Sequence, residues 1–460
     1  MIPGRRPRIP DRKDRVMPAE FTKASDLLRY IKESKVEIVN LWFTDILGVL
    51  KSFGITRHQV EEALEEGLGF DGSSVEGFAR IYESDLVAMP DISTFQLLPW
   101  ERNGRVAGRM FCDILNPDRS PYPGDPRHVL KRNLQKAAAS GYRLNVGPEL
   151  EFFYFKGPEN PEVLDKVGYF DLIADDQGTH LRQKSIRALE EMGIAVECGH
   201  HEVAPSQHEI DLKYTDALSM ADITMTYRYV VKEIARQEGV YATFMPKPLM
   251  GQNGSGMHVH QSLFKDGRNA FYDPAGQYHL SNLGRSYMGG LLRHCREFVA
   301  VTNQWVNSFK RLVPGYEAPA YVAWGQRNRS ALIRVPMYKP GKEEATRIEF
   351  RCPDPSCNPY LAFSVMLASG LAGMANNYDI PNPIEEDIFH MSDEERRERG
   401  IESMPDSLHS AIRLAESSAL VREALGEHVF GKFLDNKRIE WDNYRIAVTD
   451  YELRKYLPLL

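Results

Sequence analysis

The sequence contains few cysteines, and none is placed as a disulfide framework or a zinc site would require. Its five cysteines, an odd number, are scattered along 460 residues without a paired Cys-x-x-Cys motif. Disulfide-stapled domains and structural zinc sites depend on closely spaced cysteines. Both classes are therefore excluded, and the unpaired thiols favour the reducing cytoplasm as the compartment.

Long apolar runs and a strong excess of one charge are also missing. The most membrane-like segment, residues 361–375, is interrupted by serines and glycines and is too short to cross a bilayer. The first ten residues lack the apolar core of a signal peptide. A formal net charge of −7 does not suit a surface that binds nucleic acid or an anionic membrane. We therefore expect neither nucleic acid nor membrane as a partner.

The composition that is present is that of an ordinary folded protein, with 42% hydrophobic and 26% charged residues. A chain of this length suggests two or three domains. Residues 1–20 are basic and rich in proline, which predicts a disordered tail. A second proline-rich stretch, 116–126, predicts a linker. We therefore expect a small N-terminal domain at 21–117 and a large domain at 124–460.

Segments with helical and strand-like patterns are mixed along the chain, which predicts the α+β class. In the small domain we expect a helix at 23–34, strands at 36–43, 49–55 and 106–113, and a glycine-rich loop at 67–77. In the large domain we expect a first helix between Asp125 and Gly141, helices at 178–192, 216–238, 281–300, 358–376, 406–424 and 449–457, and strands at 143–155, 194–198, 206–212, 240–245, 256–264, 331–335 and 346–351.

Three of these strands carry polar residues on one face and apolar residues on the other. Side chains two residues apart in a strand share a face. Such a pattern taken alone is typical of an exposed edge strand, but three together favour one sheet with a polar, concave side. The polar residues are Glu149 and Glu151 in the first strand, His258, His260 and Ser262 in the second, and Arg347, Glu349 and Arg351 in the third.

Two further carboxylates, Glu202 and Glu209, lie on either side of Pro205 and are predicted to flank a turn. If they converge with the polar strands, the site contains five carboxylates and the imidazole of His258. Oxygen-rich sites of this kind suit the hard cations Mg²⁺ or Mn²⁺. So many negative charges in one cleft require about two to three such ions.

Arginines form a second cluster, which suits carboxylate or phosphate groups. The sequence lacks a Gly-x4-Gly-Lys-Ser/Thr loop, so the combination of metal ligands and arginines predicts nucleotide phosphoryl transfer outside the P-loop class. The glycine-rich run 253–256, directly before His258, indicates backbone that approaches a ligand closely. The arginines are Arg311, Arg327, Arg329, Arg334, Arg347 and Arg351.

Together these motifs resemble class I glutamine synthetases. The resemblance covers residues 22–460 and rests on segments 70–74, 147–153, 200–209, 253–260, 310–319, 327–334 and 347–360. It implies a small β-grasp domain followed by a large catalytic α+β domain, with an antiparallel sheet lining the active site. It also implies a homo-oligomer, a dodecamer of two stacked hexameric rings. The implied reaction is ATP-dependent ligation of ammonium to the γ-carboxylate of L-glutamate, through γ-glutamyl phosphate, to L-glutamine, ADP and phosphate.

The resemblance also implies roles for individual residues. The implied metal ligands are Glu151, Glu202 and Glu209 for a first ion and Glu149, His258 and Glu349 for a second. The implied glutamate-binding residues are Ser74, Gly254, Arg311, Glu317, Arg329 and Arg351, and the implied nucleotide-binding residues are Glu197, His260, Ser262, Arg334 and Arg347. The implied catalytic residues are Glu317, Arg329 and Asp71, the last of which binds ammonium from the adjacent subunit.

One departure from the family pattern leaves two alternatives open. Trp324-Gly325-Gln326 precedes Arg327, where many members have small residues. Some paralogues join glutamate to polyamines instead of ammonia, and others are non-catalytic nitrogen sensors. Against the first alternative, Asp71, Gly254 and Glu317 agree with the ammonia-using pattern. Against the second, all six metal-ligand positions hold competent residues.

Overall fold

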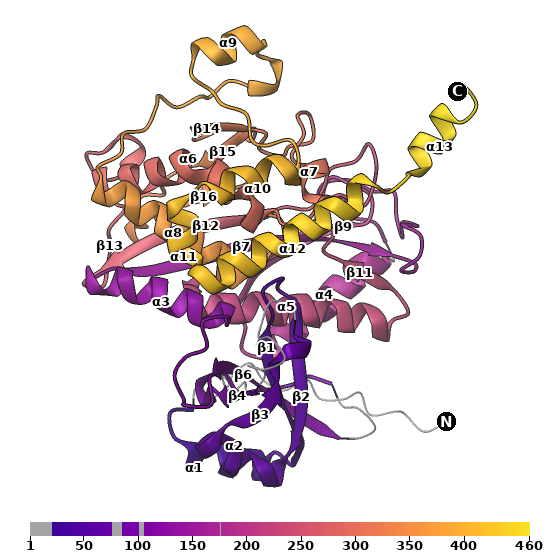
Figure 1. The fold of residues 1–460 in the computed structure, drawn as a ribbon, viewed down its shortest axis with the longest axis vertical. Coiled ribbons are helices and arrows are strands. Elements are labelled where there is room, and N and C mark those ends of the chain that lie inside the picture. The colour runs from indigo at the N-terminus through magenta and orange to yellow at the C-terminus, as the bar shows by residue number, and fades with distance from the viewer. Residues whose placement is uncertain (1–20, 76–84, 101–104, 175) are drawn as a thin grey trace, which may run out of the picture.

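The computed structural model describes residues 21–75, 85–100, 105–174 and 176–460, so the predicted tail at 1–20 lies outside the described residues. Figure 1 shows a small N-terminal domain, in indigo, beneath a larger one. The elements of the small domain are α1 (Ala24–Glu33), β1 (Val36–Thr44), β2 (Leu50–Thr56), α2 (Val60–Glu66), β3 (Leu68–Asp71), β4 (Asp85–Pro90), β5 (Gln96–Leu97) and β6 (Val106–Leu115).

The sheet of the small domain has the strand order β2-β1-β6-β4-β3, with β5 beside β6. Its central pair, β1 and β6, is parallel, and its other described pairs are antiparallel. One face buries Val39 and Leu41 of β1 against Leu27 of α1 and Val60 of α2. A mixed sheet covered by helices on one face is the arrangement expected of a β-grasp domain.

The prediction of a loop at 67–77 was wrong in part, because β3 occupies Leu68–Asp71. The glycines misled the prediction, since glycine is depleted in strands. β3 lies at the edge of the sheet and pairs only with β4 among the described strands. A Cβ at Gly69 would have no neighbouring atom within 4 Å, so a larger residue there would gain no packing contact through its Cβ.

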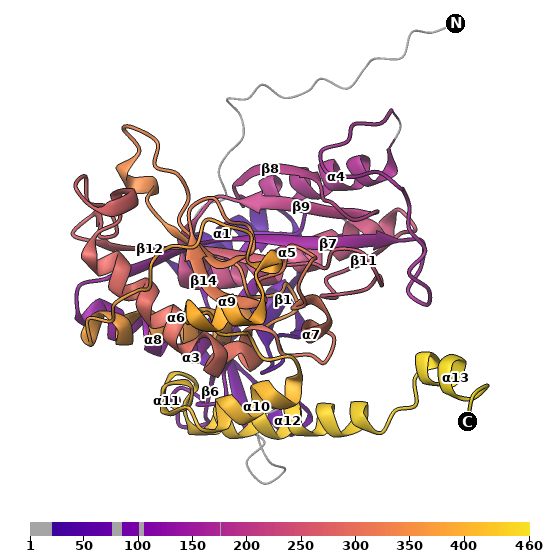
Figure 2. The same cartoon turned by 90° about the horizontal axis from the view of Figure 1, so that it is seen from above.

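The large domain is built on a second mixed sheet, of ten described strands, with the order β14-β15-β16-β12-β7-β9-β8. β10 and β11 also pair with β7, and β13 pairs with β12. Figure 2 shows the long strand β7 running through the middle of this domain. The strands are β7 (Arg143–Phe155), β8 (Val196–His201), β9 (Gln207–Leu212), β10 (Thr215–Asp216), β11 (Tyr241–Thr243), β12 (Met257–Lys265), β13 (Arg268–Asn269), β14 (Tyr321–Gly325), β15 (Ala331–Arg334) and β16 (Ile348–Phe350).

The two faces of β7 differ as the sequence predicts. Leu150 and Phe152 belong to the main hydrophobic core, beneath helices α3 and α5, which pack against β7. The Tyr227 hydroxyl of α5 donates a hydrogen bond of 3.1 Å to the Leu150 carbonyl. Glu149 and Glu151 lie on the opposite face. The hydrophobic core therefore packs against one face of the sheet, and the opposite face carries the polar residues.

Six of the seven predicted helices of the large domain begin and end close to the predicted positions. The predicted helix at 406–424 is two helices, because the Ser418 side chain accepts a hydrogen bond from Val421 N–H and starts a new helix. The long helix α12 and the short helices α7 and α9 were not predicted. The helices are α3 (Pro126–Ala139), α4 (Gln177–Glu191), α5 (Ala217–Gln237), α6 (Asn282–Thr302), α7 (Ser308–Arg311), α8 (Pro359–Ala375), α9 (Asp393–Glu398), α10 (Leu408–Glu416), α11 (Ala419–Leu425), α12 (Glu427–Arg445) and α13 (Asp450–Tyr456).

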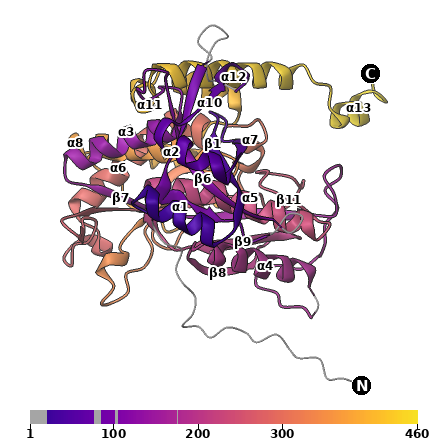
Figure 3. The ribbon, with the colours of Figure 1, turned by 90° about the horizontal axis from the view of Figure 1, so that it is seen from below.

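The last helix, α13, stands away from the body of the protein in Figures 1, 2 and 3. The segment around it exposes large apolar side chains, among them Ile446, Val448 and Leu457. Within the described residues, no helix is both long and apolar enough to cross a membrane.

The two domains share a buried contact. The rings of Trp42 in β1 and Tyr229 in α5 lie 5.1 Å apart, and the Arg109 guanidinium of β6 donates a hydrogen bond of 3.1 Å to the Thr226 hydroxyl of α5. β6 ends at Leu115 and α3 begins at Pro126. The predicted boundary, near 117–124, falls between these two elements and stays a prediction.

Candidate active site

Two adjacent cavities lie on the polar side of the large sheet. The smaller, of about 280 Å³, extends toward the loop after α7, and the larger, of about 730 Å³, extends toward β15 and the segment before β16. Four residues line both cavities: Glu149, Asp211, Arg329 and Arg334. A ligand in one cavity therefore touches the same wall as a ligand in the other.

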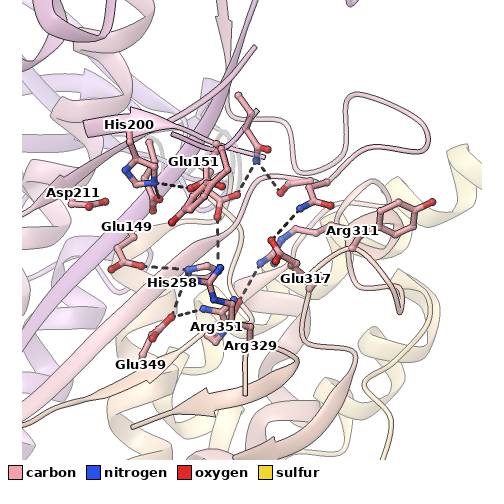
Figure 4. Close-up of a pocket in the computed structure, with 18 of the residues that line it drawn as sticks. Glu149, Glu151, His200, Asp211, His258, Arg311, Glu317, Arg329, Glu349 and Arg351 are labelled. Atoms are coloured by element: carbon pink, nitrogen blue, oxygen red, sulfur yellow. Dashed lines mark hydrogen bonds and ion pairs between the residues drawn. The ribbon is translucent and has the colours of Figure 1, made fainter. Parts of the chain in front are cut away.

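One group of potential metal ligands on this wall is Glu149, His258 and Glu349. In the sheet Glu149 is directly opposite His258, and Glu349 is opposite His260, so the side chains converge across three strands. One ligand atom from each member of the group lies within 4.8 Å of the others. Figure 4 shows the three side chains pointing toward one another. We call this group the paired cluster.

Cations surround the carboxylates of the paired cluster. The Arg351 guanidinium donates a hydrogen bond of 2.6 Å to one Glu349 oxygen, and Arg334 binds the other. Burial alone would raise the pKa of Glu349, but Arg351, His260 and His258 lower it to about 2. Burial would likewise raise the pKa of Glu149, which His260, at 2.7 Å, and His258 hold well below its ordinary value. Both carboxylates are therefore ionised near neutral pH.

A second group contains His200, Glu202 and Glu209, whose ligand atoms also lie within 4.8 Å of one another. The His200 Nε2 atom is 2.8 Å from Glu202 Oε1 and 3.2 Å from Glu209 Oε2. Glu151 is opposite Glu209 on the neighbouring strand, and its Oε2 accepts hydrogen bonds of 2.9 Å from Gly256 N–H and the Gln207 amide. We call Glu151, His200, Glu202 and Glu209 the crowded cluster.

Carboxylates in the crowded cluster face one another more than they face cations. Burial, followed by the negative charges of Asp211, Glu151 and Glu149, raises the pKa of Glu209 well above its ordinary value. Burial and the charge of Glu202 raise the pKa of Glu151 to about 8. A divalent cation would favour the ionised form of each carboxylate, so the crowded cluster fits a metal by its charge as well as by its oxygen atoms.

The β8–β9 hairpin positions the crowded cluster. Its turn begins at Glu202, whose N–H donates a hydrogen bond of 2.8 Å to the Gln207 carbonyl, whereas Glu209 lies within β9. The prediction that both carboxylates flank the turn was therefore right only for Glu202. The His201 imidazole connects the turn to Asp165. Its Nδ1 atom is 2.6 Å from the Glu202 carbonyl oxygen, and its Nε2 atom is 3.1 Å from Asp165 Oδ1.

The predicted glutamate-binding residues of the large domain come together in the smaller cavity, which Gly254, Arg311, Glu317, Arg329 and Arg351 all line. A Cβ at Gly254 would lie 2.3 Å from the Pro246 carbonyl oxygen, so only glycine fits there. Glu317 adopts a positive φ of 55° and accepts a hydrogen bond of 3.2 Å from the Asn253 amide. Glu317 is exposed to solvent where it lines the cavity, and its strained backbone is of the kind found at functional sites.

The predicted nucleotide-binding residues gather in the larger cavity. It is lined by Glu197, His260, Ser262, Arg334 and Arg347. Arg347 Nε lies 3.1 Å from the Nδ1 atom of His260, whose other ring nitrogen contacts Glu149. The larger cavity is thus lined both by basic residues, Arg334 and Arg347, and by Glu149 of the paired cluster.

Asp71 is not brought to either of these two cavities within its own chain. Asp71 ends β3 in the small domain and lines neither of the two cavities described above, and the Ser74 side chain lies outside the described structure. The Asp71 carboxylate accepts a hydrogen bond of 2.8 Å from Ser73 N–H, which caps a short helical turn.

Several residues of the smaller cavity were missed from the sequence. Asp211 could have been found, because it is two residues from Glu209 on the same strand face. The aromatic pair Tyr169 and Phe170 offered no local signal, since a loop carries both. The Phe170 ring lies 4.8 Å from that of His200. The missed lining residues are Tyr169, Phe170, Cys198, His200, Gln207 and Asp211.

Comparison with known proteins relates the whole described chain to one family. Residues 35–117 match the glutamine synthetase β-grasp domain, and residues 123–456 match the glutamine synthetase catalytic domain. A glutamine synthetase of Mycolicibacterium smegmatis is 53% identical over 439 residues, covering 94% of this chain and 98% of that protein. A glutamine synthetase of Methanosarcina mazei is 52% identical over 443 residues, covering 95% and 98%.

Solved structures agree. A chain titled as a GmaS complex with ADP superposes with a TM-score of 0.86 at 30% identity, covering 94% of this chain and 99% of that one. A cryo-EM structure of Plasmodium falciparum glutamine synthetase superposes with a TM-score of 0.85 at 27% identity, covering 96% and 100%. With both domains matched and about half of the residues identical to curated relatives, the chain belongs to the glutamine synthetase family.

Proposed function

We propose that this chain is a glutamate–ammonia ligase that forms L-glutamine, ADP and phosphate from L-glutamate, ammonium and ATP. The observation that carries the proposal is the wall shared by the two cavities, since it places potential metal ligands and arginines between a glutamate-sized and a nucleotide-sized space. The relatives named above, which are glutamine synthetases, support the same reaction.

The chemistry follows from the weakness of a carboxylate as an acyl donor. The γ-carboxylate oxygen of glutamate attacks the terminal phosphorus of ATP, the bond to the leaving ADP breaks, and an acyl phosphate forms. Ammonia then attacks the acyl carbon and phosphate leaves. In our proposal Arg329 and Arg334, on the shared wall, stabilise the transferring phosphoryl group, and Arg311 and Arg351 hold glutamate. Glu317 at the cavity mouth shields the acyl phosphate from water.

We assign divalent metal ions, Mg²⁺ or Mn²⁺, to both clusters, about two to three per site. Glu149, His258 and Glu349 would hold one ion, and Glu151, Glu202 and Glu209 another. Oxygen-rich donor sets and the raised pKa values in the crowded cluster support this assignment. Such ions offset the charge of the phosphates when they are bound. His260, Glu197, Ser262 and Arg347 would contact the nucleotide.

We assign ammonium binding and its deprotonation to Asp71, with Ser74 nearby, supplied by a neighbouring subunit. Asp71 lines neither of the two cavities of its own chain, which supports this arrangement. The exposed apolar residues around α13 also support it, because such a surface is typical of a contact with another subunit. We propose a dodecamer of two stacked hexameric rings. The five free cysteines support a cytoplasmic location.

The choice of amine is the direct test. The purified protein with glutamate, ATP and Mg²⁺ should release ADP and form glutamine with ammonium much faster than it conjugates putrescine. The position of Trp324 favours ammonium as the amine. Its ring is buried, its indole N–H donates a hydrogen bond to the Pro381 carbonyl, and the residue lines neither of the two cavities. A large preference for putrescine would make the chain a γ-glutamyl-polyamine ligase, and no glutamate-dependent ADP release with any amine would indicate a non-catalytic sensor.

The role of Asp71 has its own test. Asp71→Ala should abolish glutamine formation but retain part of the glutamate-dependent ATP cleavage, because the acyl phosphate forms before ammonia is needed. Equal loss of both activities would show that Asp71 has a structural role in its turn.

A further inference from the structure

Cys198, His200 and Asp211 form a third group of potential metal ligands, and none of them is among the six residues proposed above to hold Mg²⁺ or Mn²⁺. Their ligand atoms lie within 4.8 Å of one another, and the Cys198 Sγ atom is 2.8 Å from Asp211 Oδ2. All three line the smaller cavity. Figure 4 shows Asp211 beside His200 at the edge of the site. We call this group the thiol cluster.

An irregularity in β8 creates the thiol cluster. Val196 pairs with Leu212, but the next paired residue, Cys198, is opposite Asp211, so Glu197 is an extra residue in the strand. A bulge of this kind re-aims the side chains that follow it. From Cys198 onward the register is regular, with His200 opposite Glu209. Cys198 and His200 therefore share one face with Asp211.

The thiol cluster also has spare ligand atoms. His200 directs Nε2 at Glu202 and Glu209, while its Nδ1 atom is shielded from solvent and has no hydrogen-bond partner among the described residues. The Oδ1 atom of Asp211 is equally shielded and, in the part of the chain that the structure describes, equally unbonded. A buried polar atom without a hydrogen bond is destabilising, so a ligand that satisfied both atoms would be favoured.

We propose that Cys198, His200 and Asp211 bind Zn²⁺ at an inhibitory site that shares His200 with the crowded cluster but uses none of the six residues assigned as Mg²⁺ or Mn²⁺ ligands. One thiolate, one imidazole and one carboxylate form a donor set that Zn²⁺ accepts, with a fourth position open, and a thiolate selects against hard cations. On binding, the zinc–sulfur bond replaces the S–H bond, and the proton passes to the solvent. Across a tetrahedral Zn²⁺ the sulfur and oxygen would be about 3.5 Å apart, so the two side chains separate slightly.

Inhibition follows from what the bound side chains otherwise contact. His200 contacts both Glu202 and Glu209 of the crowded cluster, and Asp211 belongs to the wall shared by the two cavities. A zinc ion that fixes these two side chains holds the crowded cluster in one arrangement and narrows the smaller cavity. Zn²⁺ should therefore inhibit even when Mg²⁺ is in large excess.

The binding test uses Co²⁺ as a coloured substitute for Zn²⁺. The full-length, metal-stripped chain, with Mg²⁺ in large excess and without glutamate or ATP, should develop a thiolate-to-cobalt charge-transfer band that Zn²⁺ abolishes. Cys198→Ser should lose the band, and its affinity for Zn²⁺ should fall at least about tenfold. Cys112→Ala is the matched control and should keep the band, because Cys112 lies in the core of the small domain. A band that is missing in the wild type, or unchanged in Cys198→Ser, would overturn the site.

The inhibition test compares the Zn²⁺ concentrations that halve ADP release in the wild type and in Cys198→Ser. We expect the variant to need at least about ten times more Zn²⁺. Equal sensitivity would show that Zn²⁺ acts at the carboxylate clusters and would overturn the inhibitory role. The Co²⁺ band is read without turnover, so a failure of the proposed reaction leaves the binding test intact. Cys198→Ala serves as a second variant if serine disturbs the strand.

Discussion

The paired and crowded clusters lie side by side on one sheet, yet they balance charge in opposite ways. In the paired cluster Glu349 is enclosed by Arg334 and Arg351, and its pKa falls to about 2. In the crowded cluster burial and the charge of Glu202 raise the pKa of Glu151 to about 8, and within the described residues His200 is the one basic side chain that contacts both Glu202 and Glu209.

The two clusters therefore differ in how far the protein itself balances the charge of the carboxylates, although their potential ligands are similar. The paired cluster is charged and ordered by the protein itself, so a metal ion adds to an arrangement that already exists. The crowded cluster is under electrostatic strain, so a metal ion completes it. The following variants test this contrast, from the largest expected effect to the smallest.

Glu349→Gln should have the largest effect. Within the described residues Glu349 is the only carboxylate that forms ion pairs with both Arg334 and Arg351, so the change removes a buried negative charge that the two guanidinium groups share. We expect ligase activity to fall roughly 1000-fold and the free energy of unfolding to fall by about 3 kcal/mol. ADP release and chemical denaturation measure the two effects. Glu394→Gln, at an exposed position in α9, is the control and should change neither. Near-normal turnover at saturating Mg²⁺ would contradict the assignment of Glu349.

Glu209→Gln should separate activity from stability. Losing a proposed metal ligand should lower activity roughly 100-fold. The same change removes a carboxylate that Asp211, Glu151 and Glu149 repel, so the metal-free protein should keep its stability or gain about 1 kcal/mol. Thermal denaturation in the presence of a chelator gives the comparison. A loss of stability as large as that of Glu349→Gln would show that the two clusters do not differ in the way described.

Asp165→Asn should weaken the support of the crowded cluster without touching it. Asp165 accepts hydrogen bonds from Ser206 N–H, at 2.9 Å, and pairs with His201, which contacts the Glu202 carbonyl. Residues that orient a metal ligand affect metal affinity, so the Mg²⁺ concentration for half-maximal activity should rise about tenfold. Turnover at saturating Mg²⁺ should stay close to that of the wild type. Glu159→Gln, exposed in the same connection, is the control. A loss of turnover that extra Mg²⁺ does not restore would refute a positioning role.

The pH dependence of stability should be the smallest effect. Glu151 has a folded-state pKa of about 8, above the ordinary 4.5, so its contribution is fully present below pH 4.5 and is lost as pH rises to about 8. Glu349, at about 2, behaves in the opposite way: its contribution is present above pH 4.5 and is lost as pH falls to about 2.

Of Glu151 and Glu349, only Glu151 should therefore change its protonation state between pH 6 and pH 8. The metal-free protein should melt about 4 °C lower at pH 8 than at pH 6, and Mn²⁺ should reduce this difference. Glu151→Gln should flatten the profile. An equal decline with and without Mn²⁺ would indicate that other groups cause it.

Much of the site was predictable because strand alternation is a local property. The shared faces of Glu149 and Glu151, and of His258 and His260, follow from spacing alone, and the register of β7 with β12 preserves them. The β8 segment was not predictable in the same way. A single extra residue, Glu197, decides which face Cys198 uses, and only pairing with β9 reveals the bulge.

Other features depend on contacts that sequence patterns do not contain. Tyr169 and Phe170 reach the cavity because their loop folds back onto β8, where Phe170 N–H bonds the His201 carbonyl. Helix α12 escaped prediction because it starts without a side-chain cap after Gly426, contains Gly431 and is buried along one narrow stripe. In our proposal Asp71 acts across a subunit boundary, and patterns within one chain do not indicate such a boundary.

The wall shared by the two cavities has a thermodynamic consequence. Because Glu149, Asp211, Arg329 and Arg334 line both spaces, any rearrangement of them that one ligand induces alters the surface that the other ligand meets. The affinities of the two ligands are then linked, and linkage is reciprocal: the factor by which nucleotide changes the affinity for glutamate must equal the factor by which glutamate changes the affinity for nucleotide. The four shared side chains would thus couple the binding of the two substrates before the chemical reaction begins.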